Sequence, residues 1–286
     1  MISIRGADDG PVCNAVPMAE QERWQVSGSA AQKYERFVAS WFEPWAADLV
    51  TEAGLKPGWR VLDLACGTGI VTRAAAPIIG ARGEIVASDL NEGMLFEAQQ
   101  HPVEGAPVRW RVADATELPF ATGEFDGVFC QQGLQFIPDR DAAVGEMYRV
   151  LRPGGVAAVS VWSELENNPY LAALAGGLER HLSAEAGRSM AAPCGFGDPD
   201  ELRDLFVNAG FSEVVVSSPQ RDRDPTPAME AIAGNLAALP IAAQVEAMPA
   251  IDRSAMLDDI ISTLGTSIKD GQLTTPATSN VAIAIA

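Results

Sequence analysis

The sequence predicts an α/β fold of the doubly wound type, built on a mostly parallel sheet. From about residue 60 onward, short apolar runs alternate with helical patterns. The strand-like runs are RVLDLA, EIVASD, VRWRVAD, FDGVFCQ and GVAAVSVW. Helical stretches such as 91–100 and 139–151 lie between several of these runs, and this alternation is typical of βαβ units.

The last third of the chain continues the pattern. The segment FGDPDELRDLFVNAGF has Asp198 as a helix N-cap, Pro199 at the first helical position, Glu201 at the capping-box position and Gly210 as the terminator. The run SEVVVSS then predicts another strand, and NVAIAIA at the end predicts the last one.

Three segments do not fit the alternation, and we interpret them together as a cap. They are a helical region rich in Trp and Phe, an insert, and a helical stretch rich in Met and Ala, at about 20–53, 163–197 and 225–270. Inserts after strands lie at the carboxyl edge, where α/β sheets bind ligands. The alternative is that these segments only cover the sheet. At 286 residues, one elaborated domain is the default. We expect an N-terminal helical lid at 1–54, a core at 55–162, a cap insert at 163–197, a continuation of the core at 198–220, a helical cap at 221–271 and a final core strand at 272–286.

The composition indicates a globular protein, with 48% hydrophobic and 20% charged residues. No apolar run reaches the roughly 18 to 20 residues of a membrane helix, and the N-terminus lacks the pattern of a secretion signal. We therefore expect a cytoplasmic protein without a membrane span. The net charge of −18 would repel a nucleic-acid backbone, so we expect no nucleic-acid substrate.

Cysteine and histidine are too sparse for a metal site. Cys13, Cys66, Cys130 and Cys194 show no C-x-x-C spacing, and the only histidines are at 101 and 181. We expect reduced thiols and no bound metal.

The stretch VLDLACGTGI, residues 61–70, joins a strand to a glycine-rich turn. Such a turn lets the backbone approach a ligand and presents a helix N-terminus to it, although a lone G-x-G can also be an ordinary tight turn. The third glycine of the dinucleotide-binding pattern is absent, because Thr72 stands there. Asp63 ends the strand, where it would repel a pyrophosphate and attract a cation. A cationic ligand is therefore favoured over NAD.

Two further acids agree with this interpretation. Asp89 closes EIVASD, 20 residues beyond Gly69, where a strand-end carboxylate can accept both ribose hydroxyls. Asp114 closes the next strand, where it could reach an adenine amino group. Three successive strands therefore carry an acid at or near the same edge.

These motifs resemble class I S-adenosylmethionine-dependent methyltransferases, in the branch that includes the ubiquinone/menaquinone C-methyltransferases (methyltransferase type 11). The resemblance rests on VLDLACGTG, SDLNEGML, VADATELPF and FDGVFCQQGLQFIPDRDAAVGEMYRVLRPGG, and it covers about 55–162 and, less closely, 198–220. It implies a Rossmann-like seven-stranded sheet of order 3-2-1-4-5-7-6 whose last strand, supplied by NVAIAIA, is antiparallel. It also implies S-adenosyl-L-methionine as cofactor and S-adenosyl-L-homocysteine as product.

The resemblance implies positions for the parts of the cofactor. It places Asp63, Ala65, Gly67 and Gly69 around the methionine part and Asp89 on the ribose. It places Leu90 and Met94 against the adenine, with Asp114 and Ala115 at the adenine edge. Gln131 and Gln132 fall where the family touches cofactor or acceptor, and Tyr34 resembles the lid tyrosine, with packing as its alternative role. The chain departs from many relatives at Ala65, where they have Gly, and at Gln135, where they have His.

Methyl transfer needs a nucleophile held in line with the sulfonium methyl, so a catalytic base is optional. The candidate base is His181 on a cap helix, with a solvated or capping role as the alternative; Tyr34 and His101 are further candidates, and His101 is better explained as a partner of the helix dipole. Cavity or packing roles are both open for two groups, the aromatic Trp24, Trp41, Phe42 and Trp45 and the methionines Met229, Met248 and Met256.

We expect a methyltransferase that acts on a small, largely apolar or aromatic molecule, with a homodimer left open. Two alternatives remain. One is a protein that binds S-adenosylmethionine in a structural or sensory role, and the other is an NAD-dependent oxidoreductase.

Overall fold

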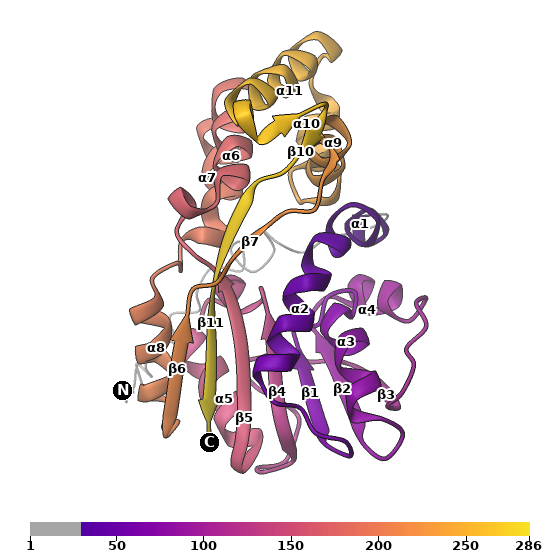
Figure 1. The fold of residues 1–286 in the computed structure, drawn as a ribbon, viewed down its shortest axis with the longest axis vertical. Coiled ribbons are helices and arrows are strands. Elements are labelled where there is room, and N and C mark those ends of the chain that lie inside the picture. Colours follow the sequence, from indigo (N-terminus) through magenta and orange to yellow (C-terminus); the bar gives the residue numbers. More distant parts are fainter. Residues whose placement is uncertain (1–29) are drawn as a thin grey trace, which may run out of the picture.

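The computed structural model describes residues 30–286, so Cys13 and Trp24 lie outside the described part of the chain. Its main sheet has the strand order β3-β2-β1-β4-β5-β11-β6, with β7 paired to β11 beyond this path (Figure 1). The strands are β1 Arg60–Leu64, β2 Glu84–Asp89, β3 Val108–Val112, β4 Phe125–Gln131, β5 Leu151–Trp162, β6 Glu213–Ser217, β7 Gln220–Asp222 and β11 Pro276–Ile285.

Strands β1 to β5 pair in parallel, and β11 lies antiparallel between β5 and β6. With β11 counted as the seventh strand of the fold, this is the expected order, and the antiparallel last strand is confirmed.

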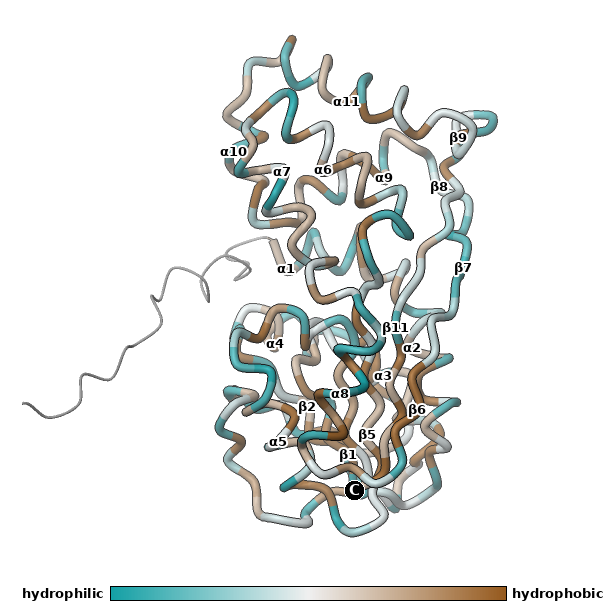
Figure 2. Tube along the Cα trace, turned by 90° about the vertical axis from the view of Figure 1, so that its left-hand side faces the viewer, coloured by the Kyte–Doolittle hydropathy of each residue, from teal (hydrophilic) through white to brown (hydrophobic). Residues whose placement is uncertain are grey.

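Both faces of the central sheet are covered, which explains why the strands β1, β2 and β4 are largely buried and apolar, whereas the outer strands β3 and β6 are partly exposed. On one face, Val61, Ile85 and Phe129 pack with α2 (Ser40–Glu52) and α3 (Ile70–Ile79). On the other face, Leu62 and Val86 pack with α5 (Arg140–Val150) and α8 (Pro199–Asn208). Consecutive residues of a strand point to opposite faces, so neighbours in sequence enter different cores. Figure 2 shows the resulting concentration of hydrophobic residues along the strands.

Local signals fix the helix ends much as the sequence predicts. Asp198 caps α8 by accepting a hydrogen bond from the Asp200 amide, and the chain leaves this helix through Gly210 at φ 103°. Asn91 caps α4 (Glu92–Ala98) by accepting hydrogen bonds from the amides of Gly93 and Met94.

A second layer of helices stands beyond the end of the sheet at which β5 leads into α6 (Figures 1 and 2). It contains α6 Pro169–His181, α7 Ala184–Ala191, α9 Ala228–Ala238, α10 Ala242–Ala247 and α11 Ala250–Leu264. It also contains a three-stranded sheet of β8 Thr226–Pro227, β10 Gln272–Leu273 and β9 Ile268–Lys269. The expectation of purely helical structure at 221–271 is therefore incomplete. We call this layer the cap.

The described chain begins with α1 (Ala30–Tyr34), which lies beside α9 of the cap. It continues through the π-helix η2 (Glu35–Ala39) into α2. We call residues 30–39 the lid segment. Among the described residues, no helix combines the length and the apolar character needed to cross a membrane.

Candidate functional site

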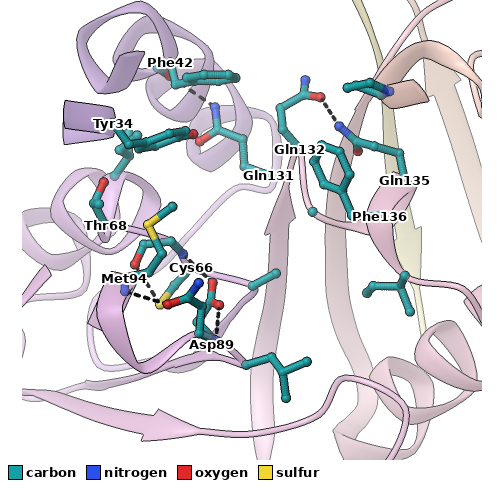
Figure 3. Close-up of a pocket in the computed structure, with 18 of the residues that line it drawn as sticks. Tyr34, Phe42, Cys66, Thr68, Asp89, Met94, Gln131, Gln132, Gln135 and Phe136 are labelled. Carbon is teal, nitrogen blue, oxygen red and sulfur yellow. Dashed lines mark hydrogen bonds between the residues drawn. The ribbon is translucent and has the colours of Figure 1, made fainter. Parts of the chain in front are cut away.

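A cavity of about 290 Å³ lies between the carboxyl end of the sheet, the lid segment and the cap. Its floor is formed by the turns after β1, β2, β3 and β4, and its walls come from η2, α2 and α9. Asp63, Asp89 and Asp114 are the only charged residues among those described that line it. The cavity therefore suits a positively charged ligand. Figure 3 shows one of these acids, Asp89, among the side chains that line the cavity.

The turn after β1 has an unusual backbone. Ala65, Gly67 and Gly69 all have positive φ angles, of 53°, 53° and 84°. Such angles are easy for glycine but strained for alanine, so the replacement of a glycine by Ala65 has a conformational cost. The Ala65 side chain also explains Gly133 in the turn after β4, since a Cβ at Gly133 would lie 2.7 Å from that of Ala65.

Asp63 is a buried carboxyl group with an incomplete set of partners. Its side chain is 1% exposed, and Oδ2 accepts a hydrogen bond of 2.6 Å from the Thr72 hydroxyl. Its Oδ1 has no hydrogen-bond partner among the described residues. Burial raises the pKa of Asp63 to about 7, and Asp89 adds a smaller contribution in the same direction. A cation placed beside this group would favour its charged form.

Asp89 holds the glycine-rich turn against the end of β2. Its Oδ2 accepts from the Gly67 amide and its Oδ1 accepts from the Asn91 amide, both at 2.8 Å. Burial raises its pKa despite these hydrogen bonds. Each carboxylate oxygen has a second lone pair, so Asp89 can still accept hydrogen bonds from a ligand.

Asp114 lies beyond β3 at the same edge. Its Oδ1 accepts hydrogen bonds from the amide and the hydroxyl of Thr116. Leu90 and Met94 line the same part of the cavity. We call the part lined by these residues and by the turns after β1 and β2 the acidic half.

Amide side chains line the other part. Gln131 donates a 3.1 Å hydrogen bond to the Phe42 carbonyl in α2, and it thereby connects β4 to the lid side. Gln132, at a strained φ of 52°, donates to the Ser279 hydroxyl, which in turn donates to the Val161 carbonyl. Gln135 donates to Gln132 Oε1.

Aromatic rings line this part of the cavity as well. The rings of Trp41 and Trp162 stack with centroids 5.2 Å apart, and Phe42 lies 5.7 Å from Trp162. The remaining lining residues on this side are mostly apolar and come largely from the cap: Leu171, Met190, Pro193, Asn235, Ala238, Leu239 and Pro240. We call this part the aromatic half.

Most of the residues singled out in the sequence lie together in this cavity. Those that line it are Tyr34, Asp63, Ala65, Gly67, Asp89, Leu90, Met94, Asp114, Ala115, Gln131 and Gln132. Gly69 does not, because it is the N-cap of α3 and faces Trp110; a Cβ there would lie 2.8 Å from that ring. Trp41 and Phe42 also line the cavity, whereas Trp45 is buried against Trp162.

The structure separates His181 from the cavity. Its Nε2 lies 3.0 Å from Asp259 Oδ2 on α11, within the cap, and it does not line the cavity. His101 is engaged with Glu97 at 3.2 Å and is not a lining residue either. Because the chain has two histidines, no imidazole lines this cavity. His181 is therefore not placed to act as a base on a ligand in this cavity, contrary to the expectation from the sequence.

The three methionines also differ from one of their expected roles. Met256 is fully buried, Met248 is buried in the same core cluster, and Met229 is 46% exposed. None of them lines the cavity; Met190 does, with Asn235 and Leu239. Sequence reasoning missed Met190, Asn235 and Leu239 because helical periodicity does not show which face of a cap helix meets a cavity.

Comparisons with known proteins agree with this architecture. A family model described as a methyltransferase domain matches residues 61–155. The ubiquinone/menaquinone biosynthesis C-methyltransferase UbiE of Ectopseudomonas mendocina is 35% identical over 185 residues, which cover 59% of this chain and 72% of that protein. The protein of the same name from Burkholderia vietnamiensis is 39% identical, but the match spans 43% of this chain and 52% of the relative.

Among solved structures, the phosphoethanolamine N-methyltransferase 2 of Haemonchus contortus in complex with S-adenosyl-L-methionine superposes with a TM-score of 0.59 at 19% identity. The match covers 96% of this chain and 61% of that one, and it supports the fold alone. On the strength of the E. mendocina relative, the matched domain and the fold, the chain belongs to the family of S-adenosylmethionine-dependent methyltransferases that includes the ubiquinone/menaquinone biosynthesis C-methyltransferases.

Proposed function

We propose that the acidic half of the cavity holds S-adenosylmethionine and that the aromatic half holds a small, largely apolar or aromatic methyl acceptor. The observation that carries this proposal is the division of charge within the cavity. Among residues 30–286, the charged side chains that line it are all aspartates, at or just beyond the ends of β1, β2 and β3, and its other half is lined by aromatic rings, amides and aliphatic side chains.

The residues of the acidic half fit the cofactor. Asp63 is a buried carboxyl group with an unpartnered oxygen, which fits the methionine ammonium group. Asp89 has lone pairs left for the two ribose hydroxyls, and Asp114 has an oxygen left for the adenine amino group. Leu90, Met94 and Ala115 provide apolar surface for the adenine ring. When bound, the cofactor supplies an electrophilic methyl group on a positively charged sulfur.

The side chains that line the cavity position the acceptor rather than take its proton. The ring of Tyr34 lines the cavity, but burial and the nearby acids Glu35 and Asp89 raise the pKa of its hydroxyl far above neutrality. Without a bound ligand that hydroxyl is therefore protonated at neutral pH, which does not favour it as a base. Cys66, which also lines the cavity, has its pKa raised well above the ordinary value by burial. Catalysis then depends on alignment, on exclusion of water and on the reactivity of the acceptor.

The class of acceptor follows from the lining. Trp41, Phe42 and Trp162 offer ring faces on which a flat molecule can stack. Gln131, Gln132 and Asn235 offer amide groups for its polar edge. An anionic acceptor would meet three aspartates and, within the described part of the chain, no lining cation. The names of the relatives make a hydroquinone the first acceptor to test.

The cytoplasmic location and the homodimer that the sequence analysis considers stay predictions.

The proposal is tested by binding and by methyl transfer. Calorimetry should show S-adenosylhomocysteine binding to the wild type, with no comparable heat from NAD. The wild type should transfer tritiated methyl groups from S-adenosylmethionine to members of a panel of small hydroquinones, phenols and apolar amines, and not to RNA or protein extracts.

A matched pair of variants locates the acceptor. Leu239→Glu places a charge in the aromatic half, whereas Met229→Glu places one on the exposed side of α9 in the same cap. We expect Leu239→Glu to lose transfer and keep S-adenosylhomocysteine binding, and Met229→Glu to match the wild type. Equal transfer by both variants, or labelling of RNA or protein with the small molecules left blank, would contradict the assignment of the aromatic half.

A further inference from the structure

The lid segment touches three parts of the molecule through different side chains. Tyr34 and Val38 line the cavity. Phe37 packs against α9, where a Cβ in place of Gly234 would lie 2.6 Å from the Phe37 ring. Glu35 points instead toward the core. These contacts all come from η2 or from Tyr34 beside it, and π-helical turns often occur at functional sites.

Arg73 joins this segment to the glycine-rich turn. It lies on α3, directly after the turn, and its Nη1 donates a 2.6 Å hydrogen bond to the Thr68 carbonyl. Its Nη2 donates a 2.8 Å hydrogen bond to Glu35 Oε1. The two side chains of this ion pair are only 20% and 15% exposed, so solvent screens the pair less than it screens a surface pair. One guanidinium group therefore contacts both the wall and the floor of the acidic half.

Thr68 itself lies at the cavity. It is a fully buried lining residue between Gly67 and Gly69, in the turn that Asp89 also holds. A displacement of its carbonyl would move the backbone that surrounds the methionine part of the proposed cofactor. A displacement of Glu35 would move Tyr34, its neighbour in sequence. The hydrogen bonds of Arg73 thus make the positions of Thr68 and Tyr34 interdependent.

We propose that Arg73 is a positioning residue that couples the lid segment to the glycine-rich turn, so that the lid segment covers the cofactor only while this guanidinium holds both. This inference rests on the proposed cofactor site. A guanidinium has a planar fork that can donate to two acceptors at once, whereas lysine has a single ammonium group. The separate Nη1 and Nη2 atoms of this fork reach Thr68 and Glu35 at the same time, so the geometry favours arginine over lysine at this position.

The neighbouring charges support Glu35 as the lid-side partner. Glu35 Oε2 is buried without a hydrogen-bond partner among the described residues, so its attachment to Arg73 depends on Oε1. His101 Nε2 lies 3.9 Å from the same Oε1, but its shorter contact, 3.2 Å, is to Glu97. Arg73 also lowers the pKa of Asp63 by its charge, which places it electrostatically within the acidic half.

The test measures coupling rather than stability. Trp41 lines the cavity and provides a fluorescence signal for stopped-flow measurement of S-adenosylhomocysteine dissociation. Hydrogen–deuterium exchange of residues 30–39, with and without S-adenosylhomocysteine, reports the lid segment directly. We expect the bound ligand to slow this exchange in the wild type. Arg73→Met should release the ligand about tenfold faster and abolish the slowing.

Two further variants sharpen the result. Arg36→Met is the matched control, because Arg36 is an exposed cation of the same π-helix whose guanidinium lies over Phe37, and it should behave as the wild type. Glu35→Met removes the lid-side carboxylate, with both its charge and its acceptor oxygens, and leaves the bond between Arg73 and Thr68 in place. Combined with Arg73→Met it should add little to the single effect, since both changes break one connection.

Three outcomes decide the matter. Loss of the ligand-induced protection in Arg73→Met and Glu35→Met, but not in Arg36→Met, supports the coupling. Wild-type dissociation and protection in Arg73→Met, or additive effects in the double variant, overturn it. If Arg73→Met does not fold, Glu35→Met alone decides by the same two measurements. A wild type that binds no S-adenosylhomocysteine would instead refute the proposed function.

Discussion

At the scale of single residues, Asp63 shows how a functional site opposes stability. A carboxyl group 1% exposed, with one oxygen unpartnered, is costly to ionise, and its pKa rises to about 7. In the unfolded chain the group returns to its ordinary value of 3.8. Between these two values the folded protein holds a proton that the unfolded chain has lost. The contribution of Asp63 to stability is therefore lost as the pH rises from about 4 to 7.

This sign gives the first prediction. Asp63→Asn keeps the shape of the side chain and removes its titration. Without ligand, the free energy of unfolding of the variant should rise relative to the wild type as the pH is raised from 5 to 8. With saturating S-adenosylhomocysteine the wild type should regain the advantage, because the ligand ammonium stabilises the carboxylate. Urea unfolding across this pH range measures both; a difference that does not change with pH would contradict the shifted pKa.

The second prediction concerns Asp89. Asp89→Ala removes an acceptor for the ribose hydroxyls and for the amides of Gly67 and Asn91. Loss of charged hydrogen bonds of this kind costs about 1.5 to 3 kcal/mol, so affinity for S-adenosylmethionine should fall roughly tenfold to a hundredfold. Asp139→Ala is the control, because that aspartate caps α5 by accepting from Ala142, and it does not line the cavity. Calorimetry that finds equal affinity in both variants would refute the ribose assignment.

At the scale of elements, β11 links the core to the cap. Its C-terminal part pairs with β5 and β6, and its first residues pair with β7. Asn280 in this strand is fully buried and donates a 2.6 Å hydrogen bond to the Gly197 carbonyl, just before α8. Asn168, at the start of α6, donates to the Thr278 carbonyl. Buried amides thus hold segments that are distant in sequence against one strand.

Replacement of Asn280 tests this role. Asn280→Leu has a similar volume but leaves the buried Gly197 carbonyl without its donor, which should lower the free energy of unfolding by about 1 to 3 kcal/mol. Ser212→Ala removes a hydrogen bond from an exposed hydroxyl to the Ile285 carbonyl of the same strand, and it should cost less than about 0.5 kcal/mol. Urea unfolding monitored by circular dichroism measures both losses. Equal losses would mean that burial does not set the contribution of Asn280.

The elements also show how far sequence reasoning reaches. The central strands β1, β2 and β4 were predictable because burial on both faces makes them apolar runs, and the family resemblance supplied the strand order. The strands β7 to β10 have two or three residues each and carry no periodic signal. The π-helix and the positive φ angles of Ala65 and Gln132 depend on tertiary contacts, so no local sequence pattern predicts them. His181 was misplaced because its distance from the cavity is set by the packing of α6 on α11.

At the scale of the whole molecule, the cavity exists because three parts meet around it. The core supplies the acidic floor, the lid segment and α2 supply one wall, and the cap supplies the other. Arg223, directly after β7, lies where these parts join. Its guanidinium carbon is 4.8 Å from the ring centre of Trp41 in α2 and 5.0 Å from that of Tyr170 in α6. The residue is 6% exposed, and its Nε and Nη1 have no hydrogen-bond partner among the described residues.

The last prediction follows from weighing the two effects of this buried cation. Two desolvated cation–π contacts contribute about 2 kcal/mol each, and burial of a guanidinium without an acid costs several kcal/mol. The two effects nearly cancel, so the volume of the side chain should matter more than its charge. Arg223→Met, which keeps much of the length, should change the free energy of unfolding by less than about 1.5 kcal/mol. Arg223→Ala leaves a gap between two rings and should cost about 2 to 4 kcal/mol. Urea unfolding followed by circular dichroism compares the two variants. If Arg223→Met loses as much stability as Arg223→Ala, then the charge of Arg223, rather than its packing between Trp41 and Tyr170, holds α2 to the cap.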